Sequence, residues 1–228
     1  MPDQPILVTF AVPQESGDFR RALRGMECAG MIRVEHIGVG PKVAGESMTR
    51  LLATEKPRLV ICTGFAGGLD SRLATDDLIV AENFSTPALV AQLRQRVSPK
   101  VAFSFGQVVS CAAPAELVAA KAALARETGA LAVDMESEAV AAACRAVTVP
   151  LLVVRAISDP AHEPLPVPFG EWFDMPRQRP RVFGLLKYLA FHPGQIGPFT
   201  HFVRNLAPAR RALAEFLVDF LASSNLPP

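Results

Sequence analysis

The sequence predicts an α/β fold, in which helices sandwich a mostly parallel sheet. Short runs of β-branched and other apolar residues alternate with segments of helical pattern along most of the chain. Runs such as LVIC and LLVV are apolar throughout, which is typical of strands buried on both faces of a parallel sheet. The 228 residues, half of them apolar, suffice for one domain with a large core.

The expected elements follow one another in strand-and-helix order. Seven strands are expected, at residues 6–12, 33–39, 59–63, 78–81, 101–109, 131–134 and 151–157. Between and after them, helical patterns occupy residues 18–28, 42–55, 88–95, 114–127, 138–146 and 209–221. The last of these helices is amphipathic and is expected to pack back on the body.

The chain changes character after Asp159. Six prolines lie within residues 160–180, which predicts a long ordered loop or lid. An aromatic, basic segment follows, and Pro193 and Gly194 divide it into two pieces. We therefore predict an α/β catalytic core over residues 1–160. Residues 161–228 are predicted to be a Pro-rich loop and a basic, aromatic, helical elaboration of the same domain.

The cysteines and histidines predict a reduced, cytoplasmic protein without a metal or cofactor. Four cysteines are scattered without a CxxC pair, and the four histidines have no metal-ligand spacing. The opening MPDQPILVTFAV lacks a basic region and a cleavage site, so no signal peptide is expected. No apolar run approaches the roughly 18 residues of a membrane-spanning helix.

Charge is distributed unevenly along the chain. The stretch between Asp174 and Glu215 has no acid but contains seven cations. These are Arg177, Arg179, Arg181, Lys187, Arg204, Arg210 and Arg211. Such asymmetry indicates an anionic partner for this part of the chain, and a solvated basic face is the alternative. Nucleic acid is not the expected partner, because no recognised binding motif is present.

Candidate functional residues follow four of the expected strands. Glu15 follows the first, the TGFAGG of residues 63–68 the third, the DMES of residues 134–137 the sixth, and Ser158 and Asp159 the seventh. Ligands of open α/β sheets bind beyond the carboxyl ends of the strands, so these groups are expected to share one edge. Taken singly, each acid is explained as well by a helix cap and the glycines by a tight turn.

Each group has a chemistry that suits cleavage of a glycosidic bond. The glycines permit close backbone approach, which suits a floor for a flat ring or a sugar. Glu136 is an acceptor for the two hydroxyl donors of a ribose. Asp159, oriented by Ser158, could protonate a leaving group if its pKa were raised, and Glu15 could polarise a water molecule. An oxocarbenium-like transition state requires such an acid, base and sugar clamp.

These motifs resemble the purine nucleoside phosphorylase and uridine phosphorylase superfamily, and most of all its methylthioadenosine/S-adenosylhomocysteine nucleosidases. The likeness covers residues 6–162 and is strongest in TGFAGGLDSRLATDDLIV, AVDMESEAVAAAC and VPLLVVRAISDPA. It implies a three-layer αβα sandwich around a central mixed sheet, no metal, and commonly a homodimer.

The resemblance also implies a role for each candidate residue. It assigns water activation to Glu15 and contact with the purine N7 edge to Asp159, supported by Ser158. Met135 and Glu136 correspond to the pair that contacts the ribose. Ala66, Gly67 and Gly68 correspond to the turn that lines the pocket, and Asp134 and Glu138 are expected to be local support and a helix-start charge.

The chain departs from these nucleosidases at three places. Phe65 replaces a serine that is common in the glycine turn, Pro114 stands where an aromatic residue would stack on adenine, and Asp134 replaces a glutamate. Glu15 favours water as the nucleophile. The alternative is phosphorolysis with phosphate as co-substrate, for which only the GDFRR of residues 17–21 resembles a phosphate-binding turn.

The segment FHPGQIGPFTHFVRN is similar to the tails of hopanoid-associated phosphorylases, which remove adenine from an adenosyl-lipid. Aromatic residues and leucines interleaved with cations also suit peripheral contact with a membrane through residues 177–211. A helix packed on the body or a dimer interface is the alternative. The sequence thus predicts hydrolysis of a purine, adenosine-type nucleoside. The alternatives are an enzyme that releases adenine from a lipid-linked nucleoside, and a non-catalytic nucleoside-binding or membrane-surface protein.

Overall fold

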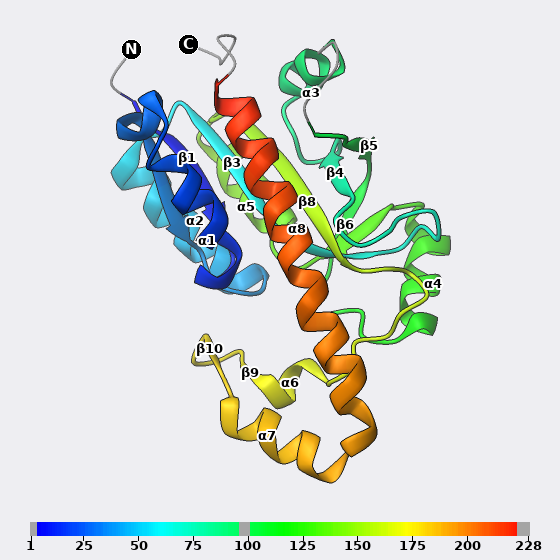
Figure 1. Cartoon of the computed structure of the whole chain (residues 1–228). Coiled ribbons are helices and arrows are strands. Elements are labelled where there is room, and N and C mark those ends of the chain that lie inside the picture. Colours follow the sequence, from blue (N-terminus) through cyan, green and yellow to red (C-terminus); the bar gives the residue numbers. More distant parts are fainter. Residues whose placement is uncertain (1–3, 96–100, 223–228) are drawn as a thin grey trace.

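The computed structural model of the chain describes residues 4–95 and 101–222, and its centre is one eight-stranded sheet. Six strands form a continuous path in the order β2-β1-β3-β8-β4-β5 (Figure 1). The bounds of these strands are β1 Ile6–Phe10, β2 Ile32–His36, β3 Leu59–Gly68, β4 Leu78–Ala81, β5 Ser104–Gly106 and β8 Leu151–Asp159. The remaining two, β6 Val108–Ser110 and β7 Ala132–Asp134, are attached to the end of β3.

Most neighbouring strands run in the same direction. Strands β2, β1, β3 and β8 are mutually parallel, as are the pairs β4–β5 and β6–β7. Strand β4 is antiparallel to β8, and β7 is antiparallel to the last two residues of β3. The sheet is therefore mixed and mostly parallel, as the sequence predicts.

Helices cover both faces of this sheet. Helices α1 (Pro13–Leu23), α3 (Pro87–Arg94) and the second half of α8 (Ile196–Ala222) contribute to the core on one face. Helices α2 (Pro41–Glu55) and α5 (Ser137–Ala146) contribute to the core on the other. The prediction of an αβα sandwich is confirmed.

The alternation of side chains along β8 explains its continuous apolar run. Leu152 and Val154 join the core beneath α1 and α8, whereas Val153 and Ile157 join the core beneath α2 and α5. Because both faces of the strand are covered, no position can be polar without a buried partner. Arg155 lies in the middle of this strand, and its partners define the site described below.

The C-terminal part forms a lobe at one end of the sheet. It contains α6 (Phe169–Trp172), the two-residue strands β9 (Phe173–Asp174) and β10 (Arg179–Pro180), α7 (Val182–Phe191) and a short 3-10 helix, Pro193–Gln195. Helix α8 then runs from the lobe back across the sheet (Figure 1). Its buried residues all lie in its second half, from Ala209 to Leu221, so this half belongs to the core. The boundary at residue 160 between a core and an elaboration stays a prediction.

Two N-terminal boundaries differ from those expected. Helix α1 begins at Pro13 instead of residue 18, because proline suits the first helical position and the Glu15 carboxylate accepts the Val12 N–H at 3.2 Å. Strand β3 continues through Gly68 instead of ending at residue 63. Its glycines, which suggested a turn, instead pair with Val133 and Ala132 of β7.

Three later boundaries also differ. Expected strand 101–109 is two short strands, β5 and β6, which pair with different neighbours, β4 and β7. Helix α4 (Val118–Thr128) begins four residues later than expected, because the backbone and side chain of Glu116 instead accept hydrogen bonds from Leu165 and Phe169. Helix α8 begins at Ile196 instead of residue 209 and passes through Pro208.

Within residues 4–95 and 101–222, no helix is both long enough and apolar enough to cross a bilayer.

Candidate active site

The predicted acids come from three parts of the chain that meet at the carboxyl ends of β1, β3 and β8. Glu15 lies in the first turn of α1, Glu136 directly precedes α5, and Asp159 is the last residue of β8. All three are buried, with exposed fractions of 6% each. Buried carboxylates require donors or give up their charge, so their partners determine what each can do.

Arg155 is the cation at the centre of the acids that surround the end of β7. Its side chain is 1% exposed, and its Nε lies 2.7 Å from Oδ2 of Asp134. Its Nη2 lies 3.8 Å from Oε2 of Glu136 and donates to the Ser137 hydroxyl at 3.0 Å. Burial alone would lower the pKa of Arg155, but the acids around it outweigh burial and raise that pKa, so the guanidinium stays charged.

Asp134 is the principal counter-ion of Arg155. Besides the guanidinium, its carboxylate accepts hydrogen bonds from the hydroxyls of Ser110 and Ser137. These contacts occupy both carboxylate oxygens. Asp134 therefore holds Arg155 and the start of α5 in place, which fits the local support expected of it. Glu138 is exposed in the first turn of α5.

Glu136 is held more loosely. Its Oε1 accepts the N–H of Gly40 at 2.9 Å, and Arg155 approaches its other oxygen only to 3.8 Å. Burial raises the pKa of Glu136 to about 7, although Arg155 acts to lower it. Gly40 has φ of +91°, a conformation that side-chain-bearing residues rarely adopt, and a Cβ there would lie 2.8 Å from Cε of Met175. Glycine at this position thus allows the N–H to reach Glu136.

The Glu15 carboxylate connects the backbone that follows β1 to the backbone of β3. Its Oε2 accepts the N–H groups of Ala11 and Val12, and its Oε1 accepts that of Phe65 at 3.1 Å. Burial raises the pKa of Glu15 above its ordinary value. A Cβ on Gly64 would lie 2.8 Å from Nη1 of Arg155 and 3.0 Å from Oε1 of Glu15. Only glycine lets these two groups approach across β3.

Asp159 is engaged by two side chains. Ser158 donates its hydroxyl to Oδ1 at 2.6 Å, and Nζ of Lys121 lies 2.5 Å from Oδ2. Lys121 is fully buried and also donates to the carbonyls of Pro160 and Glu163, each at 2.8 Å. Burial raises the pKa of Asp159, and the Lys121 ammonium opposes this rise.

The strand segment from Phe65 to Gly67 connects the two groups of acids. Phe65 binds Glu15 through its N–H, Ala66 accepts the Ser158 hydroxyl through its carbonyl at 3.3 Å, and Gly67 is paired with Asp159 in the sheet. The two residue steps from Phe65 to Gly67 span roughly 6–7 Å along the strand. The prediction of a turn at Ala66, Gly67 and Gly68 is therefore wrong, because these residues belong to strand β3. The Phe65 side chain packs against the core shared with α1 and α8.

The C-terminal lobe covers the side of the site where Met135 lies. Met135 is 8% exposed and packs with Val39 and Phe173, and Trp172 and Met175 adjoin the same cluster. The amide of Gln178 makes two hydrogen bonds to the backbone of Val39, at 2.7 and 3.0 Å. The Pro-rich region is thus an ordered cover over the neighbourhood of Glu136.

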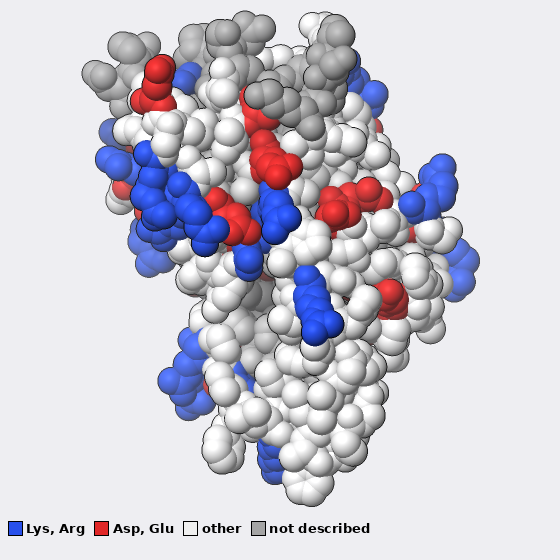
Figure 2. Space-filling view, in the orientation of Figure 1, with Lys and Arg blue, Asp and Glu red and all other residues white. Residues whose placement is uncertain are grey.

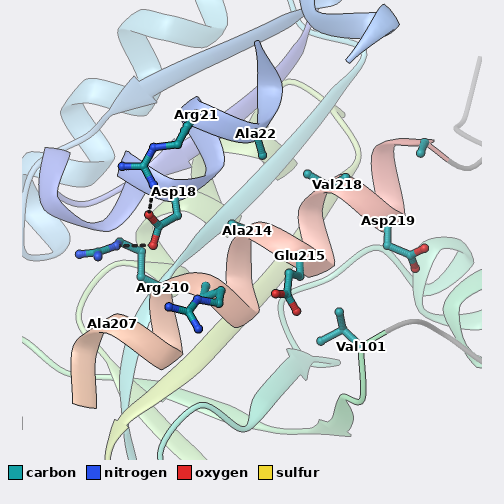
Figure 3. Close-up of a pocket in the computed structure, with 12 residues that line it drawn as sticks. Asp18, Arg21, Ala22, Val101, Ala207, Arg210, Ala214, Glu215, Val218 and Asp219 are labelled. Carbon is teal, nitrogen blue, oxygen red and sulfur yellow. Dashed lines mark hydrogen bonds and ion pairs between the residues drawn. The ribbon is translucent and has the colours of Figure 1, made fainter. Parts of the chain in front are cut away.

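The GDFRR stretch of residues 17–21 forms no phosphate-binding turn. It lies inside α1, and Asp18 binds Arg21 at 3.2 Å and Arg210 of α8 at 2.7 Å, in a groove between these helices (Figure 3). Asp18 has a lowered pKa, chiefly through its hydrogen bond with Arg210. Because the stretch is helical, its backbone donors are committed to the helix and cannot cradle an anion.

Sequence reasoning missed the two buried cations. Arg155 interrupts the apolar run LLVVRAIS, and a charge inside a fully buried strand signals a buried partner. Lys121 lies in the alanine-rich AAKAAL, which gives no comparable signal. Within residues 4–95 and 101–222, no cluster of three or more histidines, cysteines or acids suits a metal ion. The lack of a cofactor requirement stays a prediction.

Comparison with known proteins gives consistent matches. A family model described as the phosphorylase superfamily matches residues 82–179. The 5′-methylthioadenosine/S-adenosylhomocysteine nucleosidase of Haemophilus influenzae (strain PittEE) is 28% identical over 168 residues, which cover 60% of this chain and 72% of the relative.

Solved structures match over almost the whole chain. A mutant futalosine hydrolase of Helicobacter pylori has a TM-score of 0.70 at 19% identity, covering 96% of this chain and 98% of that one. An inhibitor complex of the 5′-methylthioadenosine/S-adenosylhomocysteine nucleosidase of the same organism has a TM-score of 0.69 at 19% identity, with the same coverage. At such identities the structures establish the fold. The family model and the curated relative show that the chain is similar, over the matched residues, to enzymes of the phosphorylase superfamily.

Proposed function

We propose that the protein is a nucleosidase that hydrolyses the N-glycosidic bond of a purine, adenosine-type nucleoside. The observation that carries the proposal is the position of Glu15, Glu136 and Asp159 along one sheet edge, with Phe65 to Gly67 between them. The curated relative is a nucleosidase that, by its name, acts on methylthioadenosine and S-adenosylhomocysteine. Its similarity supports the same reaction class here.

Asp159 is the proposed acid. Cleavage of the bond between C1′ and the purine sends the bonding electrons into the base, and a proton from Asp159 to the purine N7 stabilises the leaving group. Ser158 orients one carboxylate oxygen, and burial favours the protonated form. Lys121 favours the ionised form, but burial is the larger influence, and the pKa of Asp159 is raised.

Glu136 and Glu15 are the proposed sugar clamp and base. The ionised Glu136 accepts hydrogen bonds from the ribose hydroxyls. Among residues 4–95 and 101–222, the one cation near its Oε2 is Arg155, at 3.8 Å, and no hydrogen bond occupies this oxygen. Glu15 accepts the proton of the water that attacks C1′. Its raised pKa makes it a stronger base than an ordinary glutamate, and its Oε1 retains acceptor capacity beside the Phe65 N–H.

The charge of this site favours water over phosphate as the nucleophile. Glu15, Asp134 and Glu136 surround the single guanidinium of Arg155, which Asp134 already engages at 2.7 Å. A phosphate dianion placed here would meet excess negative charge in a buried environment, where like charges repel strongly. Residues 17–21, the only phosphate-binding turn suggested by the sequence, are helical.

Replacement of the acid tests the mechanism. We expect Asp159→Asn to lower base release by at least about a hundredfold, because the amide cannot protonate the purine. The same change leaves the buried Lys121 ammonium without its counter-ion, so we also expect a loss of about 3 kcal/mol or more in the free energy of unfolding.

The matched control is Asp159→Asn combined with Lys121→Met. The double variant should recover part of the lost thermal stability, since it buries no unpaired charge, while base release stays absent. Chromatography of the free base and thermal unfolding separate the two effects. Substantial base release by a folded double variant would contradict the role of Asp159.

The pH dependence tests Glu136. Its pKa is raised to about 7, and the proposed clamp is the ionised form, so kcat/KM should rise with pH through about 7. In Glu136→Gln the side chain does not titrate, so the rise in kcat/KM near pH 7 should disappear. The kcat/KM of this variant should also be lower at every pH. A limb near pH 7 that persists in Glu136→Gln would assign the titration to another group.

A second candidate function has one observation in its favour. The lobe that covers Met135 also carries an exposed, strongly apolar helix, α7, as expected of an enzyme whose nucleoside is attached to a lipid such as a hopanoid. Adenine release from methylthioadenosine and from a lipid-linked adenosine should be compared at equal concentration, with and without phosphate. A kcat/KM at least about tenfold higher for the lipid-linked compound would favour this candidate, and equal or lower values would favour a water-soluble substrate.

A further inference from the structure

Helix α7 is almost entirely apolar and yet has no buried residue. Its sequence is VFGLLKYLAF, in which only Lys187 is charged, and every position is half-buried or exposed. Phe183 is 85% exposed and Phe191 74%. Helices that are hydrophobic on all sides are normally enclosed by protein or lipid, so α7 lacks the partner that its composition requires.

The exposed apolar side chains of this region lie close together in the sequence. Outside the lobe and α8, the large exposed apolar residues of the described chain are Met31, the adjacent pair Leu117 and Val118, and Val147, whereas six lie between residues 182 and 203. They are Val182, Phe183, Leu186, Phe191, Ile196 and Val203. In the space-filling view the lobe is mostly white, with Lys and Arg at its margins (Figure 2). We call this set, with the cations named next, the α7 face.

Most charges around these side chains are positive. The nearby acids are Glu171 of α6, which is exposed, and Asp174, which pairs with Arg177 at 3.1 Å. Arg179, Arg181, Lys187 and Arg204 are all exposed and lie within or beside the apolar set. No acid occurs between Asp174 and Glu215 in the sequence. A partner that covers the α7 face must therefore offer apolar surface to its aromatic and aliphatic side chains and negative charge to its cations.

We propose that the α7 face binds the surface of an anionic membrane. Exposed phenylalanines enter the boundary between headgroups and acyl chains, while lysine and arginine remain at the anionic headgroups. A second copy of the same face is a poorer partner, because symmetric contact would bring its cations against one another. With 10 residues, α7 is about 15 Å long, so it lies on the bilayer and does not cross it.

The α7 face is joined directly to the cover of the candidate active site. The backbone N–H of Arg181 donates to the carbonyl of Trp172 at 2.7 Å, and its guanidinium donates to the carbonyl of Gly170 at 2.9 Å. Trp172 in turn adjoins the cluster that contains Met135. Membrane contact would thus place the covered side of the site next to the lipid surface. The proposal concerns binding alone and does not depend on the identity of the substrate.

Sedimentation of the full-length protein with vesicles tests the proposal. The vesicles are phosphatidylcholine alone and phosphatidylcholine mixed with phosphatidylglycerol. We expect the protein to sediment with the mixed vesicles and to be released at about 1 M salt, where screening acts within roughly 3 Å. Phe183→Ser combined with Phe191→Ser should lower the partition coefficient by at least about tenfold, because both side chains lose apolar burial.

A matched variant controls for the loss of exposed apolar surface in general. Met31→Ser combined with Val147→Ser changes two side chains, 46% and 54% exposed, outside the α7 face and should leave partitioning unchanged. Circular dichroism and base release from a soluble nucleoside establish that both variants are folded.

Three results would overturn the proposal. They are recovery in the supernatant with both kinds of vesicle, equal binding to neutral and anionic vesicles, and equal loss of binding in the two double variants. A stable dimer that the Phe183 and Phe191 changes dissociate, without vesicle binding by the parent protein, would instead assign the α7 face to contact between copies of the chain. Failure of base release with intact vesicle binding would count against the proposed reaction alone.

Discussion

Arg155 is the constraint on which the arrangement of the candidate site depends. A guanidinium 1% exposed in the middle of a fully buried strand must be paired, because an uncompensated buried charge would cost several kcal/mol. Asp134 supplies the pairing, which fixes the end of β7 and the start of α5. Glycine at position 64 is required for the same reason, since any side chain there would collide with the guanidinium and with Glu15. The position of Glu136 follows, because it lies two residues beyond Asp134.

This arrangement gives neighbouring acids different properties. Asp134 is engaged by Arg155 and two serines, whereas Glu136 has one backbone donor and a more distant cation. The weaker compensation explains why burial raises the pKa of Glu136 to about 7. Asp159 has its own cation, Lys121, from a different helix. The proposed acid and the proposed clamp thus have separate partners, and the excess of carboxylates around Arg155 is the reason for proposing water over an anionic co-substrate.

The general plan of the site could be predicted from the sequence, because acids that follow parallel strands meet at one edge. That rule places Glu15, Glu136 and Asp159 together without any knowledge of their contacts. It could not predict Lys121, whose burial depends on how α4 packs against the segment after β8. It also misjudged the glycines of β3, since their preference for turns was outweighed by pairing with β7 and β8. Cations inside apolar runs are the sequence signal that would have improved the prediction.

The central claim is that this cluster of carboxylates directs water, and not phosphate, to the anomeric carbon. Incubation of the enzyme with a purine nucleoside in phosphate buffer prepared with oxygen-18 water tests it most directly. Mass spectrometry of the sugar product should show one heavy oxygen at C1′ and an unphosphorylated sugar. A sugar 1-phosphate as the main product would contradict the account.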